Sequence, residues 1–296
     1  MVPMIQNSQR KASWSILTLC LKTFQKSIIE LATMKITVIT PVYNGAETIR
    51  TCVESVRAQA YGDFEYIIVD GGSTDDTIEI IKSLKFEKLK WISEKDKGLY
   101  DAFNKGINMA TGEVVCFLCA DDMYANNGVL QKVADAFVKN TETEMIYTDL
   151  VYVHRDDLSK IDRYWKSSAF KPGLFKKGWL PPNTALFIKR NNFLKYGMFD
   201  LRFKMAADFE LQYRFFEKHR LRSLYIPGIS VNMRSGGVSN SNMSNMFKSL
   251  NECYRALRLH HVKFPSLYIF NTLFYRLNQL IIPRRLKNQY KQNRIS

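Results

Sequence analysis

The sequence predicts an α/β fold built on a mostly parallel β-sheet. From residue 35 to about residue 140, short β-rich runs alternate with helical stretches. Strands that alternate with helices in this way form right-handed βαβ crossovers. An apolar fraction of 46%, with 13% aromatic residues, supplies a core and argues against a disordered chain. A chain of 296 residues suits one large α/β domain with a C-terminal appendage better than two full-sized domains.

The first half of the chain is expected to contain four strand-helix pairs. In chain order they are 36–40 with 46–59, 66–69 with 76–84, 89–93 with 99–110, and 114–118 with 128–139. Ligands bind at the carboxyl ends of the strands in open sheets of this kind. The loops after these four strands are therefore expected to form one site.

The second half is less regular. Short strands are expected at 145–148, 151–154 and 184–189, followed by a helix over about 207–218 and strands near Leu224 and Val231. After Gly236 and Gly237 the chain becomes helical and basic.

The formal net charge of +15 requires a polyanionic partner or surface: nucleic acid, anionic lipid or a phosphate-bearing substrate. The cations are concentrated in the last stretch of the chain, where Glu252 is the only acid. This stretch also carries Leu, Ile, Phe and Tyr, a composition that suits the interface of an anionic membrane. A solvated basic helix packed on the main domain is the alternative. The cations are Lys248, Arg255, Arg258, Lys263, Arg276, Arg284, Arg285, Lys287, Lys291 and Arg294.

The five cysteines are scattered and odd in number, which fits a reducing cytoplasm rather than a disulfide framework. Cys116 and Cys119 form a CxxC inside an apolar run, so we expect them to lie in the core. No run reaches the ~18 consecutive apolar residues that a spanning helix requires. Residues 1–33 are expected to be an N-terminal extension, either disordered and upstream of the natural start or a weak amphipathic anchor.

Polar residues and turn formers follow each of the four predicted strands. The loops are residues 41–45, 70–76, 94–98 and 120–122, and ordinary turn and N-cap chemistry is the alternative for any one of them. P-loop, GxGxxG and kinase motifs are missing, so a pyrophosphate must be held another way. Asp121 and Asp122 suit Mg²⁺ or Mn²⁺, which would neutralise a departing diphosphate. Capping of the helix near Gly128 is the alternative.

These loops resemble, in order and spacing, the motifs of family 2 glycosyltransferases. The resemblance covers residues 34 to 240, and its second half is similar to the polysaccharide-assembly branch. The matching runs are ITVITPVYN at 36–44, VDGGSTDDT at 69–77, EKDKGLYDAFNKG at 94–106, DD at 121–122, PPN at 181–183, FD at 199–200, AADFEL at 206–211 and MRSGGVS at 233–239.

The resemblance implies a GT-A fold, a Rossmann-like mixed sheet flanked by helices. Residues 34–240 would form the catalytic domain, with the nucleotide-sugar half at 34–125, the acceptor half at 126–240, and a basic amphipathic helical tail at 241–296. It also implies roles for the loop residues. Thr40, Pro41 and Tyr43 would line the base pocket, Asp70 would read the base, Asp96 would lie near the ribose and diphosphate, and Asp122 would ligate Mn²⁺ or Mg²⁺ with Asp121 in support.

Inverting transfer needs one carboxylate that takes the proton of the acceptor hydroxyl as the hydroxyl attacks the anomeric carbon. Asp208 matches the family's base position, and its apolar neighbours favour a raised pKa. A charge that only stabilises the start of a helix is the alternative. Glu210, two residues on, would face elsewhere. Arg234, beside Gly236 and Gly237, is expected on a flexible loop that closes on the diphosphate.

Two residues are expected near the acceptor. Asn183 stands where many relatives have a His, and its amide offers hydrogen bonds but cannot titrate. Trp179 could stack on a sugar face or lie in the core. The four histidines lack a shared metal-ligand spacing, which argues against zinc.

The sequence thus predicts an inverting glycosyltransferase of bacterial cell-surface polysaccharide synthesis. It would use a UDP-sugar and a lipid-linked or saccharide acceptor, and lie in the cytoplasm at the inner face of the membrane. A catalytically silent assembly partner is one alternative, and a basic nucleic-acid-binding protein is another. Nucleic acid is not expected as a partner, because no DNA- or RNA-binding motif is visible and the acidic loops would repel a polyanion.

Overall fold

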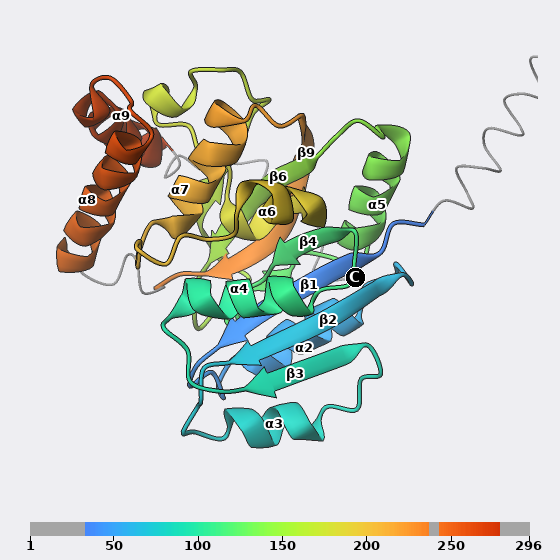
Figure 1. The fold of residues 1–296 in the computed structure, drawn as a ribbon. Coiled ribbons are helices and arrows are strands. Elements are labelled where there is room, and N and C mark those ends of the chain that lie inside the picture. The colour runs from blue at the N-terminus through green and yellow to red at the C-terminus, as the bar shows by residue number, and fades with distance from the viewer. Residues whose placement is uncertain (1–32, 237–242, 279–296) are drawn as a thin grey trace, which may run out of the picture.

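The computed structural model describes residues 33–236 and 243–278, which form a nine-stranded mixed sheet with helices on both faces (Figure 1). The main path is β3-β2-β1-β4-β8-β6-β9-β5, and β7 pairs with β6. The predicted α/β class is confirmed. The strands are β1 (Ile36–Val42), β2 (Phe64–Asp70), β3 (Leu89–Ser93), β4 (Val114–Phe117), β5 (Met123–Tyr124), β6 (Met145–Val153), β7 (Ile161–Trp165), β8 (Leu186–Lys189) and β9 (Ser223–Arg234).

Helices connect most of these strands. The α-helices are α2 (Ile49–Arg57), α3 (Thr77–Ser83), α4 (Leu99–Met109), α5 (Val129–Lys139), α6 (Arg190–Tyr196), α7 (Ala207–Tyr213), α8 (Met243–Leu259) and α9 (Pro265–Asn278). Two short 3₁₀ turns, η1 (Phe175–Lys177) and η2 (Asn183–Ala185), precede β8, and a π-helical turn, η3 (Arg214–Lys218), continues α7. All but the last residue of the predicted extension 1–33 lies outside the described residues, as does part of the predicted tail.

The sheet has an apolar core on each face because successive strand residues point to opposite sides. Val38 faces a cluster with residues of α2 and α5, whereas Ile39 faces a cluster with residues of α4, α6 and α7. In Figure 1, α4 crosses one face of the sheet and α2 lies behind it. The sheet is continuous across the two predicted halves, since β4 pairs with β1 on one side and with β8 on the other.

Two pairs of predicted strands are single long strands. The runs 145–148 and 151–154 both belong to β6, and the strands near Leu224 and Val231 both belong to β9. Asp149 interrupts the apolar pattern of β6, but its buried carboxylate accepts the hydroxyls of Tyr164 and Tyr225 at 2.9 and 2.8 Å. Register shifts on either side of Asp149 absorb the irregularity in the pairing with β9. The sequence indicated two separate strands here, but the hydrogen bonds to the buried Asp149 carboxylate allow one continuous strand.

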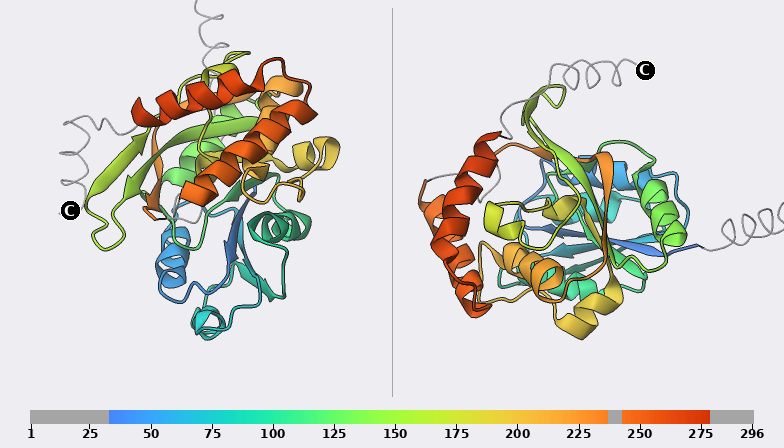
Figure 2. Two further views of the ribbon diagram at one scale, coloured as in Figure 1. Left: turned by 90° about the vertical axis from the view of Figure 1, so that its left-hand side faces the viewer. Right: turned by 90° about the horizontal axis from the view of Figure 1, so that it is seen from above.

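The C-terminal helices pack against the second half of the domain, beside α7 (Figures 1 and 2). Cys253, Ala256 and Leu257 of α8 are buried in the same cluster as Phe209 of α7, at the three- and four-residue spacing of one helix face. Among the described helices, none has both the length and the apolarity needed to cross a bilayer.

Candidate active site

The carboxyl ends of β1, β2 and β3 lie side by side, because Val42, Asp70 and Ser93 are register neighbours. Asp70 ends β2 and is fully buried. Its carboxylate accepts the N–H groups of Gly72 and Ser73 at 2.9 and 3.0 Å, and the Ser93 hydroxyl at 2.7 Å. These bonds hold the β2 loop in shape and join it to the end of β3.

The loop after β1 is tied to the loop after β2. The N–H of Asn44 donates to the Ser73 hydroxyl, and the Asn44 amide oxygen accepts the N–H of Thr74, both at 2.8 Å. Of the three residues predicted to line a base pocket, Tyr43 is exposed, whereas Thr40 and Pro41 are buried. The Thr40 hydroxyl accepts that of Tyr66 at 3.0 Å. Tyr43 is thus the member whose side chain is open to a ligand, and Asn44, which we did not single out, shapes the loop.

Asp96 is brought against the β2 loop. A Cβ atom added at Gly71 would lie only 2.5 Å from the Asp96 Oδ2, so glycine permits this close approach. The other carboxylate oxygen accepts the N–H of Gly98 at 2.8 Å, in a turn where Gly98 has φ +113°. The predicted nucleotide-side carboxylates therefore meet at one sheet edge.

Asp122 is the most unusual carboxylate of the site. It is only 1% exposed, and neither of its oxygens has a hydrogen-bond partner among the described residues. Burial raises its pKa well above the ordinary range, and the charge of Asp121 raises it further. A buried carboxylate without a partner is costly unless it is protonated or bound to a cation.

The surroundings of Asp122 fit a divalent cation. Ligand atoms of Cys119, Asp121 and Asp122 lie within 4.8 Å of one another. Carboxylate oxygens are the ligands that Mg²⁺ and Mn²⁺ prefer, so the two aspartates are the natural pair. Burial raises the pKa of the Cys119 thiol well above its ordinary value, which disfavours the thiolate as a ligand.

Arg234 is not on a flexible loop, so that prediction is wrong. It is the last residue of β9, it is buried, and its guanidinium donates to the backbone carbonyl of Asp121 at 2.7 Å. The pairing of β9 with β5 and β6 fixes its position. Arg234 therefore holds the backbone of the acidic pair and leaves a positive charge beside Asp122.

Asp208 lies in the first turn of α7, half-buried, and accepts the hydroxyl of Tyr100 at 2.9 Å. Burial and the charge of Asp208 raise the pKa of Tyr100 well above its ordinary value, so Tyr100 stays protonated and donates. Charges on Asp121, Asp122 and Asp208 all raise the pKa of Cys119. The fold thus brings three carboxylates within electrostatic reach of Cys119, two from the loop after β4 and one from α7.

Glu210 has a different environment, as expected from its position two residues after Asp208. It is buried and pairs with Arg214 and His260, each at 2.8 Å. Burial alone would raise its pKa, but hydrogen bonds from His260 and Arg214 outweigh burial and lower it. Glu210 is therefore part of the packing between α7 and the end of α8.

Trp179 is 2% exposed and lies among the rings of Tyr147, Phe170, Phe175 and Phe216. With its ring covered, the indole offers no face for stacking on a sugar. Of the two positions considered for Trp179, at a sugar or in the core, the structure has the core position.

Asn183 is half-buried in η2, and its amide oxygen lies 3.5 Å from the Gln212 Nε2. Gln212 is fully buried, one helical turn after Asp208, and its Oε1 has no partner in the described part of the chain. Residues four apart share a helix face. The sequence analysis missed Gln212, which the spacing from Asp208 could have indicated.

Comparison with known families identifies the chain. Residues 37–206, more than half of it, match the model described as Glycosyl transferase family 2. The chain belongs to this family. The predicted family and enzyme class are thereby confirmed.

Relatives of this glycosyltransferase include proteins of Mycobacterium bovis and Nostoc sp.. It is 29% identical over 229 residues to a "PGL/p-HBAD biosynthesis glycosyltransferase" of Mycobacterium bovis, an alignment covering 73% of this chain and 84% of the relative. It is 42% identical over 107 residues to an uncharacterized glycosyltransferase of Nostoc sp., covering 35% of this chain and 33% of that one.

Solved structures share its fold. TarS of S. aureus, residues 1–349 with UDP-GlcNAc, aligns with TM-score 0.54 and 18% identity over 87% of this chain and 70% of TarS. The mannosyltransferase PcManGT of Pyrobaculum calidifontis, in complex with GDP-Man and Mn²⁺, aligns with TM-score 0.57 and 15% identity over 88% and 74% of the two chains. At these identities the likeness shows the fold alone, and the predicted GT-A fold is confirmed.

Proposed function

We propose that this protein is an inverting glycosyltransferase that moves a sugar from a UDP-sugar to a lipid-linked saccharide in bacterial cell-surface polysaccharide synthesis. One observation carries the proposal: the buried, unpartnered carboxylate of Asp122 lies beside Asp121 in a cluster with Cys119, and Cys119 lies within electrostatic reach of Asp208. A cation-binding pair with one further carboxylate nearby supplies the leaving-group stabilisation and the base of a metal-assisted inverting transfer.

Asp122, supported by Asp121, would hold Mn²⁺ or Mg²⁺. When bound, the cation neutralises the negative charge that develops on the leaving diphosphate. Arg234 keeps the Asp121 backbone in place and adds a fixed positive charge on the same side. The cation and Arg234 would together hold the diphosphate, the task that a P-loop performs in other nucleotide-binding proteins.

Asp208 would act as the base. As the acceptor oxygen forms its bond to the anomeric carbon, the bond from that carbon to the diphosphate oxygen breaks, and Asp208 takes the acceptor's proton. The Tyr100 hydroxyl fixes the orientation of the carboxylate by donating to its Oδ1. Because both the attack and the departure occur in one step from opposite faces, the anomeric configuration inverts.

The nucleotide would lie along the β1, β2 and β3 loops. The exposed ring of Tyr43 would contact the base, and the loop held by Asp70, with Asp96 beside it, would contact the base and ribose. Neighbours of the same fold have been solved with UDP, UDP-GlcNAc and GDP-Man, which supports a nucleotide-sugar donor.

The acceptor would enter between η2 and α7, where Asn183 and Gln212 lie beside the face of Asp208. The half-buried Asn183 amide offers hydrogen bonds to sugar hydroxyls, while the fully buried Gln212 contacts that amide from the protein side.

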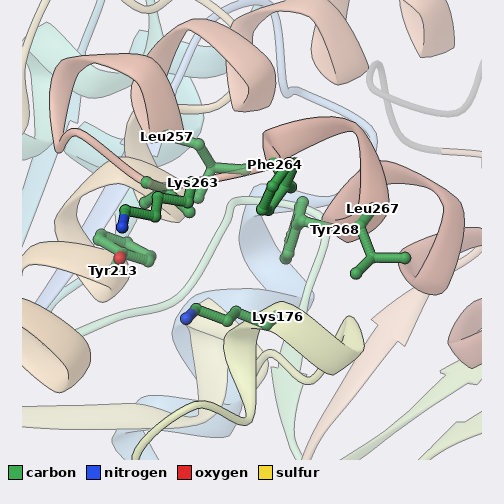
Figure 3. Close-up of a pocket in the computed structure, with 8 residues that line it drawn as sticks. Lys176, Tyr213, Leu257, Lys263, Phe264, Leu267 and Tyr268 are labelled. Atoms are coloured by element: carbon green, nitrogen blue, oxygen red, sulfur yellow. The ribbon is translucent and has the colours of Figure 1, made fainter.

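The turn between α8 and α9 would rest on the inner face of the cell membrane. Phe264, Leu267 and Phe270 are 80%, 56% and 58% exposed. Figure 3 shows the adjacent cavity of about 230 Å³, with Lys176 and Lys263 among its walls and their ammonium groups on the same side of it. Phe264 also has a left-handed backbone, with φ 57°. Exposed apolar side chains beside cations are the combination that anionic headgroups attract.

We expect Phe264→Asp to lower binding to anionic vesicles about 10-fold or more, since burial of one Phe side chain contributes about 1.5–3 kcal/mol. Vesicles of phosphatidylcholine with phosphatidylglycerol, separated by flotation, measure the bound fraction. Leu194→Asp, at a 59% exposed leucine of α6, is the matched control and should bind like the parent. Equal losses in both variants, or a parent that does not float, would contradict the membrane role.

We expect Tyr100→Phe to lower kcat about 10- to 100-fold with little change in the donor KM. The change removes only the hydroxyl that orients Asp208 and keeps the ring contacts of Tyr100 with Phe103 and Phe199. A net hydrogen bond to a charged group contributes about 1.5–3 kcal/mol, which corresponds to this range. Steady-state kinetics with varied donor concentration separate the two parameters, and a larger donor KM at unchanged kcat would argue against the assignment.

The proposed function is tested with purified protein, Mn²⁺ and a panel of UDP-, GDP- and dTDP-sugars, with and without lipid-diphosphate saccharide acceptors. Metal-dependent release of one nucleotide, stimulated by one acceptor and lost in Asp122→Ala and Asp208→Ala, is the expected result. If no donor of the panel releases its nucleotide and calorimetry detects no nucleotide binding, the catalytic proposal is overturned. That result would favour a catalytically inactive assembly partner.

A further inference from the structure

Glu252 is the only acid in the basic C-terminal stretch, and the structure gives it an unusual set of partners. It lies on α8, whose neighbouring residues Cys253 and Ala256 are buried against the domain. Its carboxylate accepts three consecutive backbone N–H groups, those of Lys204, Met205 and Ala206, at 3.0, 2.7 and 3.1 Å. All three belong to the segment that leads into α7.

This segment lacks a cap of its own. Ala206 is the N-cap residue of α7, and its side chain cannot accept a hydrogen bond from the first turn. The first N–H groups of a helix have no partner within the helix, and a negative charge near them is stabilising. Glu252 supplies an acceptor for the N–H of the N-cap residue Ala206 and for the two N–H groups before it, and it brings a negative charge to the helix start from 46 to 48 residues away in sequence.

Asp208 follows Ala206 by two residues. A second contact from the same side, His260 with Glu210, holds the next part of α7 to the end of α8. From the opposite side, Tyr100 of α4 holds the Asp208 carboxylate itself. The start of α7 is thus fixed between the nucleotide half and the C-terminal helix.

We infer that Glu252 is a positioning residue for the transfer reaction: by binding the backbone at 204–206, it sets where α7 begins and hence where Asp208 lies. The inference rests on the proposed role of Asp208 as the base. A base displaced by about 1 Å can lose about 10²-fold in rate, even when the change lies away from the chemistry. The C-terminal helix would then be a part of the catalytic apparatus and not only an anchor.

Kinetics of Glu252→Ala, Glu252→Gln and Asn251→Ala test this. We expect Glu252→Ala to lower kcat about 10- to 100-fold with the donor KM unchanged. Glu252→Gln should recover part of the loss, because the amide oxygen accepts N–H groups without the charge. Asn251→Ala, at an exposed neighbour on the same helix, should behave like the parent.

Hydrogen exchange of the peptide 203–209 provides a readout that does not depend on activity. We expect faster exchange there in Glu252→Ala and parental exchange in the strands of the sheet. Unchanged exchange at 203–209, or a donor affinity that falls in step with kcat, would overturn the inference. If the parent itself transfers no sugar, the proposed function fails, and the exchange comparison still decides whether Glu252 holds the start of α7.

Discussion

Asp208→Asn is expected to lower kcat for sugar transfer by about 10²–10⁴-fold, the range that one general base contributes. The amide keeps the size of the side chain and can still accept the Tyr100 hydroxyl, so the local structure should persist. What is lost is the ability to take the acceptor's proton. Donor binding should remain, because the proposed nucleotide site is formed by the loops after β1 to β4 and does not include Asp208.

Kinetics of transfer, together with calorimetry of UDP binding, check this prediction. Glu210→Gln is the matched contrast on the same helix. It would leave Arg214 and His260 without their buried charge partner, so we expect lower thermal stability, by about 3–5 kcal/mol, as its main effect. An Asp208→Asn protein that transfers sugar at the parental rate would exclude Asp208 as the base.

Asp122→Asn is expected to abolish metal-dependent transfer and, in the absence of metal, to leave the protein at least as stable as the parent. The parent buries a carboxylate that has no hydrogen-bond partner among the described residues, and a neutral amide removes that charge. A ligand that binds the folded state at 100 times its Kd stabilises it by about 2.7 kcal/mol. Mn²⁺ should therefore raise the Tm of the parent and not that of the variant.

Thermal unfolding in EDTA and in Mn²⁺, with transfer assays on the same samples, measures both effects. Asp135→Asn, at an exposed carboxylate of α5, serves as the control and should retain the metal response. A parental Mn²⁺ shift in Asp122→Asn would mean that the cation binds elsewhere.

The first half of the fold could be predicted from the sequence because its signals are local. Strands such as β3 and helices such as α4 and α5 differ from their predicted ranges by a residue or less at each end. In the second half, strand boundaries were predicted wrongly where polar residues lie inside a strand. Asp149 lies between two runs predicted as separate strands, yet tyrosine hydroxyls accommodate it within β6. In β9, Pro227 and Gly228 lie at a register shift, between residues that pair with β6 on either side. The short strands β5 and β7 form by pairing with β9 and β6, and their own sequences gave no strand pattern.

The candidate site shows the same division. The acidic pair Asp121 and Asp122 could be found from its place at the end of an apolar strand. The proposed role of Asp208 as the base came from a family resemblance, and no local pattern indicates it. Arg234 was misplaced because two glycines next to it suggested a loop, while strand pairing decides its position. The partners of Glu252 lie across a helix packing that sequence periodicity does not encode.

The place of β4 in the sheet has a consequence for how the chain reaches its fold. β4 is fully buried, but its second neighbour, β8, is synthesised roughly 70 residues later, which takes several seconds at about 5–20 residues per second. During that interval the nascent nucleotide half presents an apolar strand with an open edge, the kind of surface that pairs with other chains. Early folding of this half therefore brings a risk of aggregation, which ends only when β8 closes the edge.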